Sequence, residues 1–175
     1  VLFVIILFFS GKDMQRIVSS WILYLSRQNE ITHFDQERLI KLLHFSQLAD
    51  KSSALPHIIE GNISFERQDL SHAINSYKIA STIDNQNAYA LNNLATTCFE
   101  TGDFNNALQF QQDAARINPN NAIIYYNLGI YLAEKGDIED AVIAFKEGSY
   151  IDPNWFSPHV QLASLYIQMQ NFELA

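Results

Sequence analysis

Five histidines and one cysteine are the side chains of this sequence best suited to bind a metal ion or carry out catalysis. They are His33, His44, His57, His72, His159 and Cys98. None of the histidines has the spacing of zinc ligands, and a lone cysteine cannot close a disulfide within the chain. The sequence also contains no phosphate-binding loop, nucleophile elbow or zinc-protease motif. We therefore predict no catalytic residue, no metal site and no cofactor for this segment.

Amide side chains form a more regular pattern, because Asn93 and Asn127 occupy equivalent places in a repeated motif. Asn-Asn-Leu-Ala at 92–95 returns as Tyr-Asn-Leu-Gly at 126–129, an interval of 34 residues. That period is typical of stacked helical hairpins, in which equivalent residues of successive repeats lie one above the other. Each amide both donates and accepts hydrogen bonds, so a stacked pair can hold the backbone of an extended peptide.

Two helices per repeat must position these side chains. In the clearest repeat the apolar and small residues form two stripes at helical spacing: Tyr125, Leu128, Gly129 and Leu132, then Ala141, Phe145 and Gly148. Gly136 lies between the stripes, where a glycine in the left-handed conformation ends the first helix. Asp137 follows it, and we expect its carboxylate to cap the second helix by accepting backbone N–H bonds.

These stripes resemble the tetratricopeptide repeat, which pairs leucine and small residues in one helix with small and aromatic residues in the next, and places proline after them. The matching residues of the second repeat are Leu91, Leu94, Ala95, Cys98, Ala107, Gln111, Ala114 and Pro119. The first repeat departs most, with Glu60 in place of leucine and Asn85 in place of proline. The resemblance implies an all-α right-handed superhelical solenoid. Its repeats are predicted at residues 54–87, 88–121, 122–155 and, truncated, 156–175.

The resemblance also implies a concave groove lined by the first helix of each repeat. The groove residues predicted to bind a partner are Tyr89, Asn92, Asn93, Thr96, Tyr126, Asn127 and Ile130. Asn93 and Asn127 are similar to the asparagine ladder in the repeat domain of O-linked N-acetylglucosamine transferases. Asparagine at this position is also a common framework residue without a ligand, and that alternative stays open.

Charge restricts the class of partner. Residues 54–175 carry 5 Lys and Arg against 14 Asp and Glu, a net charge of −9, which repels nucleic acid. Glu66, Glu100 and Glu134 recur at one repeat position, either as a solvated edge or as a negative rim that attracts a basic segment. The clamp with which the family holds acidic chaperone tails needs lysine or arginine in the groove, where this sequence has none. We expect a neutral or basic protein or peptide and no acidic chaperone tail.

The amino-terminal part differs from the repeats. Residues 1–9 are wholly apolar but, at about 1.5 Å per residue, too short to span about 30 Å of hydrocarbon. We interpret residues 1–16 as the end of a transmembrane helix with its polar flank, in a fragment of a longer protein; a signal-peptide core and a buried helix are the alternatives. Residues 17–53 are interpreted as a helical linker or a degenerate repeat.

Three functions are consistent with this organisation. The first is a membrane-anchored scaffold that binds protein partners without catalysis, on a side of the membrane that the sequence does not indicate. The second is the carboxy-terminal tail of a multi-span membrane glycosyltransferase, of the O-antigen ligase or protein O-mannosyltransferase type. The third is a cytoplasmic scaffold in which residues 1–9 are simply buried.

Overall fold

The computed structural model describes residues 52–173, with side-chain environments given to residue 170. Within this range the chain forms seven helices and no strand, which confirms the predicted all-α class. The predicted membrane segment at 1–16 and nearly all of the predicted linker at 17–53 lie outside the described residues. Among the helices that are described, none is both long and apolar enough to cross a bilayer. The chain divides into two compact units after residue 85.

The first unit contains one described hairpin, α4 (Leu55–Glu66) and α5 (Leu70–Ile83). Gly61 of α4 faces the ring of Tyr77, and a Cβ atom at residue 61 would lie 2.6 Å from that ring. Asp69 caps α5 by accepting a hydrogen bond from the backbone N–H of His72 at 3.2 Å. Gln68, in the turn, has a φ of 62° and is therefore left-handed.

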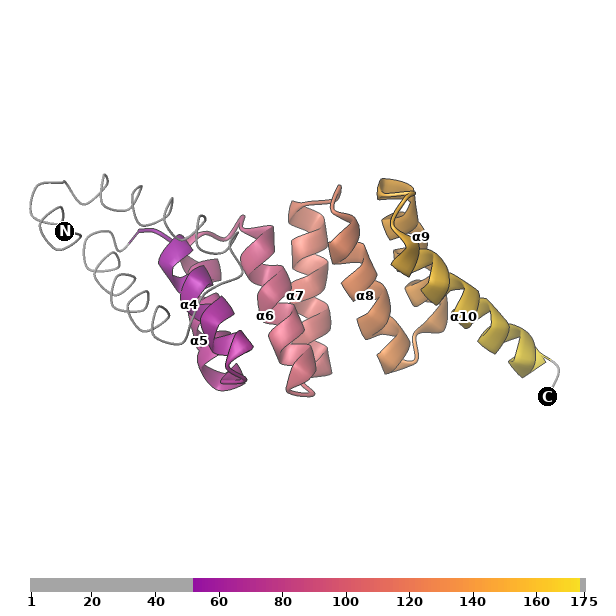
Figure 1. Cartoon of the computed structure of the whole chain (residues 1–175), viewed down its shortest axis with the longest axis horizontal. Coiled ribbons are helices and arrows are strands. Elements are labelled where there is room, and N and C mark those ends of the chain that lie inside the picture. Colours follow the sequence, from indigo (N-terminus) through magenta and orange to yellow (C-terminus); the bar gives the residue numbers. More distant parts are fainter. Residues whose placement is uncertain (1–51, 174–175) are drawn as a thin grey trace, which may run out of the picture. The chain divides into compact units, whose positions relative to one another are not determined.

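The second unit contains five helices, α6 (Ala88–Glu100), α7 (Phe104–Ile117), α8 (Ala122–Lys135), α9 (Ile138–Ile151) and α10 (Phe156–Glu173). Each packs on the next along the chain, and α6 also contacts α8 directly. Figure 1 shows these helices side by side in chain order, from rose at α6 to yellow at α10. The contact between α6 and α8 is what brings residues of successive repeats together.

The turn between α8 and α9 confirms one prediction and corrects another. Gly136 has a φ of 92° and ends α8 in the left-handed conformation, as predicted. The predicted cap by Asp137 is wrong: its side chain accepts no backbone N–H and instead pairs with Nζ of Lys135 at 2.7 Å. A charged partner two residues earlier holds the carboxylate away from α9. Asp103 does cap α7 in the expected way, through the N–H of Asn106.

Close helix contacts in the second unit depend on which side chains meet inside each hairpin. In the α8–α9 hairpin Phe145 is 1% exposed and lies against Gly129, where a Cβ atom would come within 2.7 Å of the ring. In the α6–α7 hairpin the equivalent residues are Ala95 and Gln111, both 0% exposed. The second repeat therefore buries an amide where its neighbours bury an aromatic ring.

Candidate functional site

The residues predicted to bind a partner lie on α6 and α8, and we call this set the α6–α8 face. Its members are Tyr89, Asn92, Asn93 and Thr96 on α6, and Tyr126, Asn127 and Ile130 on α8. Tyr89 is 55% exposed, and the other six are half-buried. Half-burial leaves these side chains accessible to a ligand while their neighbours restrict their rotamers.

Asn92 is the centre of the polar contacts on this face. Its Oδ1 accepts hydrogen bonds from Nε2 of Gln111 at 3.0 Å and from Nδ2 of Asn127 at 3.1 Å, and its Nδ2 donates to Oδ1 of Asn93 at 3.3 Å. Nε2 of Gln111 also donates to the backbone carbonyl of Ile124 at 2.8 Å. These bonds join α6, α7 and α8. Asn127 therefore bonds to Asn92 rather than to Asn93, its equivalent in the preceding repeat.

A second direct link between α6 and α8 passes through Thr96. The hydroxyl of Tyr131 donates to Oγ1 of Thr96 at 3.0 Å, and Thr96 in turn donates to the backbone carbonyl of Asn92. The Tyr131 ring stacks on Phe99 with a centroid separation of 4.5 Å. Burial raises the pKa of Tyr131 to about 12, because its ionised form would lose its hydration. Thr96 is thus held in place by a buried tyrosine.

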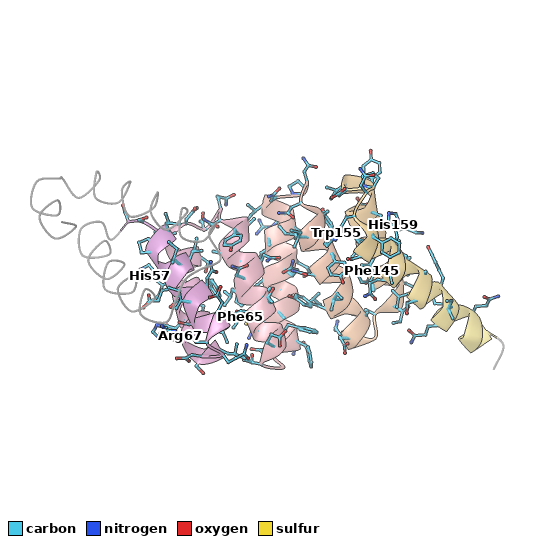
Figure 2. All side chains as sticks on the ribbon, viewed as in Figure 1. His57, Phe65, Arg67, Phe145, Trp155 and His159 are labelled. Atoms are coloured by element: carbon cyan, nitrogen blue, oxygen red, sulfur yellow. The ribbon has the colours of Figure 1, made fainter. Side chains whose placement is uncertain are left out.

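Tyr126 has a packing role in addition to the predicted ligand contact. Its ring centroid lies 5.8 Å from that of Phe145 and 4.9 Å from that of Trp155, both labelled in Figure 2. Tilted aromatic pairs at these separations stabilise packing by about 0.5 to 1.5 kcal/mol beyond area burial. The ring therefore has a defined orientation on the α6–α8 face.

Charge around the face is predominantly negative. Glu100 and Glu134 are exposed near the ends of α6 and α8. The basic side chains of the described second unit lie elsewhere: Arg116 pairs with Asp113 at 2.8 Å, Lys135 pairs with Asp137, and Lys146 lies over the ring of Tyr166. The seven face residues themselves carry no charge.

In the first unit, Glu60 contacts two histidines. Its Oε1 lies 3.2 Å from Nε2 of His72, and its Oε2 lies 3.8 Å from Nδ1 of His57. Burial lowers the pKa of His57 by more than the nearby Glu60 raises it. No group of three histidine, cysteine, aspartate or glutamate side chains between residues 52 and 173 is arranged to hold a metal ion.

Gln111 is a residue of the site that sequence reasoning placed in the core without assigning it a role. Its signal in the sequence was the departure from the aromatic residue found at the same repeat position, Tyr77 and Phe145. A polar residue at a buried position requires hydrogen-bond partners. The sequence could not name those partners, because they lie on two other helices.

Comparison with known proteins identifies the class. A family described as Tetratricopeptide repeat matches residues 86–149, and a second described as TPR repeat matches residues 61–102. The chain belongs to the tetratricopeptide repeat family. No protein with a curated description matches the sequence.

Several solved structures are similar to this chain. The pilF protein of Pseudomonas aeruginosa has a TM-score of 0.78 and 21% identity, over 92% of this chain and 71% of its own. MamA from Desulfovibrio magneticus RS-1 has a TM-score of 0.75 and 15% identity, over 94% and 88%. The first TPR domain of Spaghetti (RPAP3), bound to the HSP90 peptide SRMEEVD, has a TM-score of 0.66 and 21% identity, over 69% and 96%. Likeness at these identities supports the helical-repeat fold.

Proposed function

We propose that this chain is a protein-interaction scaffold that binds an extended peptide, or a partner helix, across the α6–α8 face. The observation that carries the proposal is the continuous array of uncharged amide groups, from Asn93 through Asn92 to Asn127, joined across two repeats. Groups held at fixed positions lose little conformational entropy when a ligand binds. Amide groups can also donate to the C=O groups and accept from the N–H groups of a peptide backbone.

Electrostatics favours a neutral or basic partner. Exposed Glu100 and Glu134 flank an uncharged face, and residues 86–175 carry three basic residues against ten acidic ones. Such a field attracts cationic segments and repels polyanions, including nucleic acid. The peptide bound to the RPAP3 domain is acidic, but a carboxylate clamp needs basic side chains, and this face has none. We therefore do not expect an acidic chaperone tail to bind here.

A random-peptide display library, selected on the 175-residue chain, tests the proposal. The dissociation constants of the selected peptides are measured for the chain and for the double variant Asn93→Ala, Asn127→Ala. Loss of two amide contacts of about 1 kcal/mol each predicts at least about tenfold weaker binding. The matched control, Asn105→Ala with Asn120→Ala, removes two exposed asparagines away from the face and should not change the affinity. Equal affinity of the chain and the first double variant would mean that the asparagines are framework residues.

Membrane attachment is a separate part of the proposal and is supported only by the apolar run at residues 1–9. Detergent phase partition of the chain and of a variant lacking residues 1–9 tests it. We expect the chain to partition into the detergent phase and the shortened variant into the aqueous phase. Partition of both into the aqueous phase would contradict membrane attachment. The glycosyltransferase alternative stays a prediction.

A further inference from the structure

Gln111 is a buried amide at the base of the α6–α8 face. It is 0% exposed, although its carbonyl oxygen Oε1 has no hydrogen-bond partner, the single such buried side-chain atom in the described part of the chain. Leaving a buried acceptor unpaired costs roughly 1 to 3 kcal/mol. Its Nε2 makes two hydrogen bonds, so the residue is held by its donor end.

The orientation of three amides follows from one backbone atom. The carbonyl oxygen of Ile124 can only accept a hydrogen bond, so the Gln111 atom 2.8 Å from it must be nitrogen. The Asn92 atom 3.0 Å from that nitrogen must then be oxygen. The Asn127 atom 3.1 Å from that oxygen must in turn be nitrogen. Rotating any one of these amides by half a turn would place like groups together.

The same series of hydrogen bonds determines which atom of the Asn127 amide can contact a ligand. Its Nδ2 is directed at Asn92, so its Oδ1 lies at the other end of the amide. Among the described residues no hydrogen bond ends on that oxygen, and it is not one of the fully buried unpaired atoms, so at least part of it is accessible to solvent. An open carbonyl oxygen accepts hydrogen bonds and cannot donate them.

We propose that Gln111 is a positioning residue that, through Asn92, fixes Asn127 with its Oδ1 toward the ligand, so that the α6–α8 face selects a peptide with a backbone N–H at that point. The inference rests on the proposed function and specifies its ligand. A peptide carbonyl at the same point meets another carbonyl and is rejected. Negative charge around the face adds to the preference for a donor.

A backbone N-methyl scan of the selected peptides tests the inference. Each peptide is resynthesised with one N–H at a time replaced by N-methyl, which removes that donor. We expect one position at which methylation weakens binding to the chain by about fivefold to tenfold. The penalty at that position should fall below about twofold with Asn127→Ala, which lacks the acceptor.

Variants of Gln111 separate positioning from packing. Gln111→Met keeps the length of the side chain but not the donor, so the Asn127 amide can turn and the N-methyl penalty should shrink to below about threefold. Adding Asn127→Asp to this variant should restore the N-methyl penalty, because a carboxylate presents an oxygen in either orientation. The matched control is Gln112→Met, an exposed glutamine beside it on α7, which should leave the scan unchanged. If Gln111→Met does not fold by circular dichroism, Asn92→Ala interrupts the same chain of bonds.

The outcomes distinguish the two proposals. The role of Gln111 is overturned, and the scaffold function left standing, by peptides that bind with no methyl-sensitive position. The same holds for peptides whose sensitivity survives Gln111→Met, or survives Asn92→Ala where Gln111→Met does not fold. Failure of the library to yield any binding peptide overturns both. A selected partner that binds only as a folded helix, with no backbone N–H available, also overturns the inference and supports the broader function.

Discussion

The α6–α7 and α8–α9 hairpins share a repeat register but fill the space between their helices differently. Phe145 packs on Gly129 in one hairpin, whereas the equivalent positions of the other hairpin hold Gln111 and Ala95, both buried. A Cβ atom at residue 129 would overlap the phenylalanine ring, and the same atom is present in Ala95. We therefore expect this methyl group to disfavour an aromatic residue at position 111. The amide found there instead links the core to the α6–α8 face.

The largest effect should come from breaking the glycine contact. Gly129→Leu places a branched side chain where even a Cβ atom lies 2.7 Å from Phe145, so we expect a loss of about 3 kcal/mol in the free energy of unfolding. Urea denaturation measures it, with Glu139→Gln, an exposed position, as the control expected to change stability by under about 0.5 kcal/mol. Equal stabilities would refute the packing register.

Converting one hairpin into the other is the next test. Gln111→Phe introduces a ring against Ala95 and should cost about 2 kcal/mol by overpacking, and Ala95→Gly in the same chain should recover at least about half of it. A double-mutant cycle in urea measures the coupling between the two positions. If the stability changes of the two substitutions are additive, the residue at position 95 does not restrict the side chain at position 111.

A third test concerns the hydrogen bond between Tyr131 of α8 and Thr96 of α6. Tyr131 reaches Thr96, whereas the equivalent Thr97 bonds the backbone of its own helix at Asn93. Because burial raises the pKa of Tyr131 to about 12, its contribution to stability is complete below about pH 10 and is lost as the pH rises toward 12.

We expect this loss to be on the order of 1 to 2 kcal/mol and absent in Tyr131→Phe. Urea denaturation across that pH range measures it, with the highly exposed Tyr150→Phe as the matched control. The interpretation is wrong if the two variants show the same alkaline profile.

The smallest effect belongs to the α4–α5 hairpin, whose turn has Gln68 where the other two hairpins have Gly102 and Gly136. All three residues have positive φ, which costs a residue with a side chain about 1 kcal/mol. Gln68→Gly should therefore raise the melting temperature and stabilise the chain by about 0.5 to 1 kcal/mol. The preceding Arg67 has a φ of −81°, so Arg67→Gly serves as a control that should not stabilise. No gain from Gln68→Gly would argue against strain in this turn.

Several features of the fold were predictable because they depend on local spacing. Stripes at helical spacing predicted α8 and α9, and Gly136 predicted the end of α8. The failure of Asp137 to cap α9 was not predictable, because Lys135 competes for the carboxylate and the sequence does not show which partner is nearer. Tyr126 was predicted to bind a ligand, but its packing on Trp155 was not predicted, because Trp155 follows α9 and meets α8 only in the folded chain.

The sequence alone determined the family and the helical class, because a 34-residue period of stripes at helical spacing is typical of stacked helical hairpins. Only the tertiary structure decided how the side chains of the α6–α8 face are joined. It linked Asn127 to Asn92 instead of Asn93, and it brought Gln111 from a third helix to orient both. Hydrogen bonds depend on differences of a few tenths of an ångström between neighbouring helices, and a repeat period does not encode distances of that size.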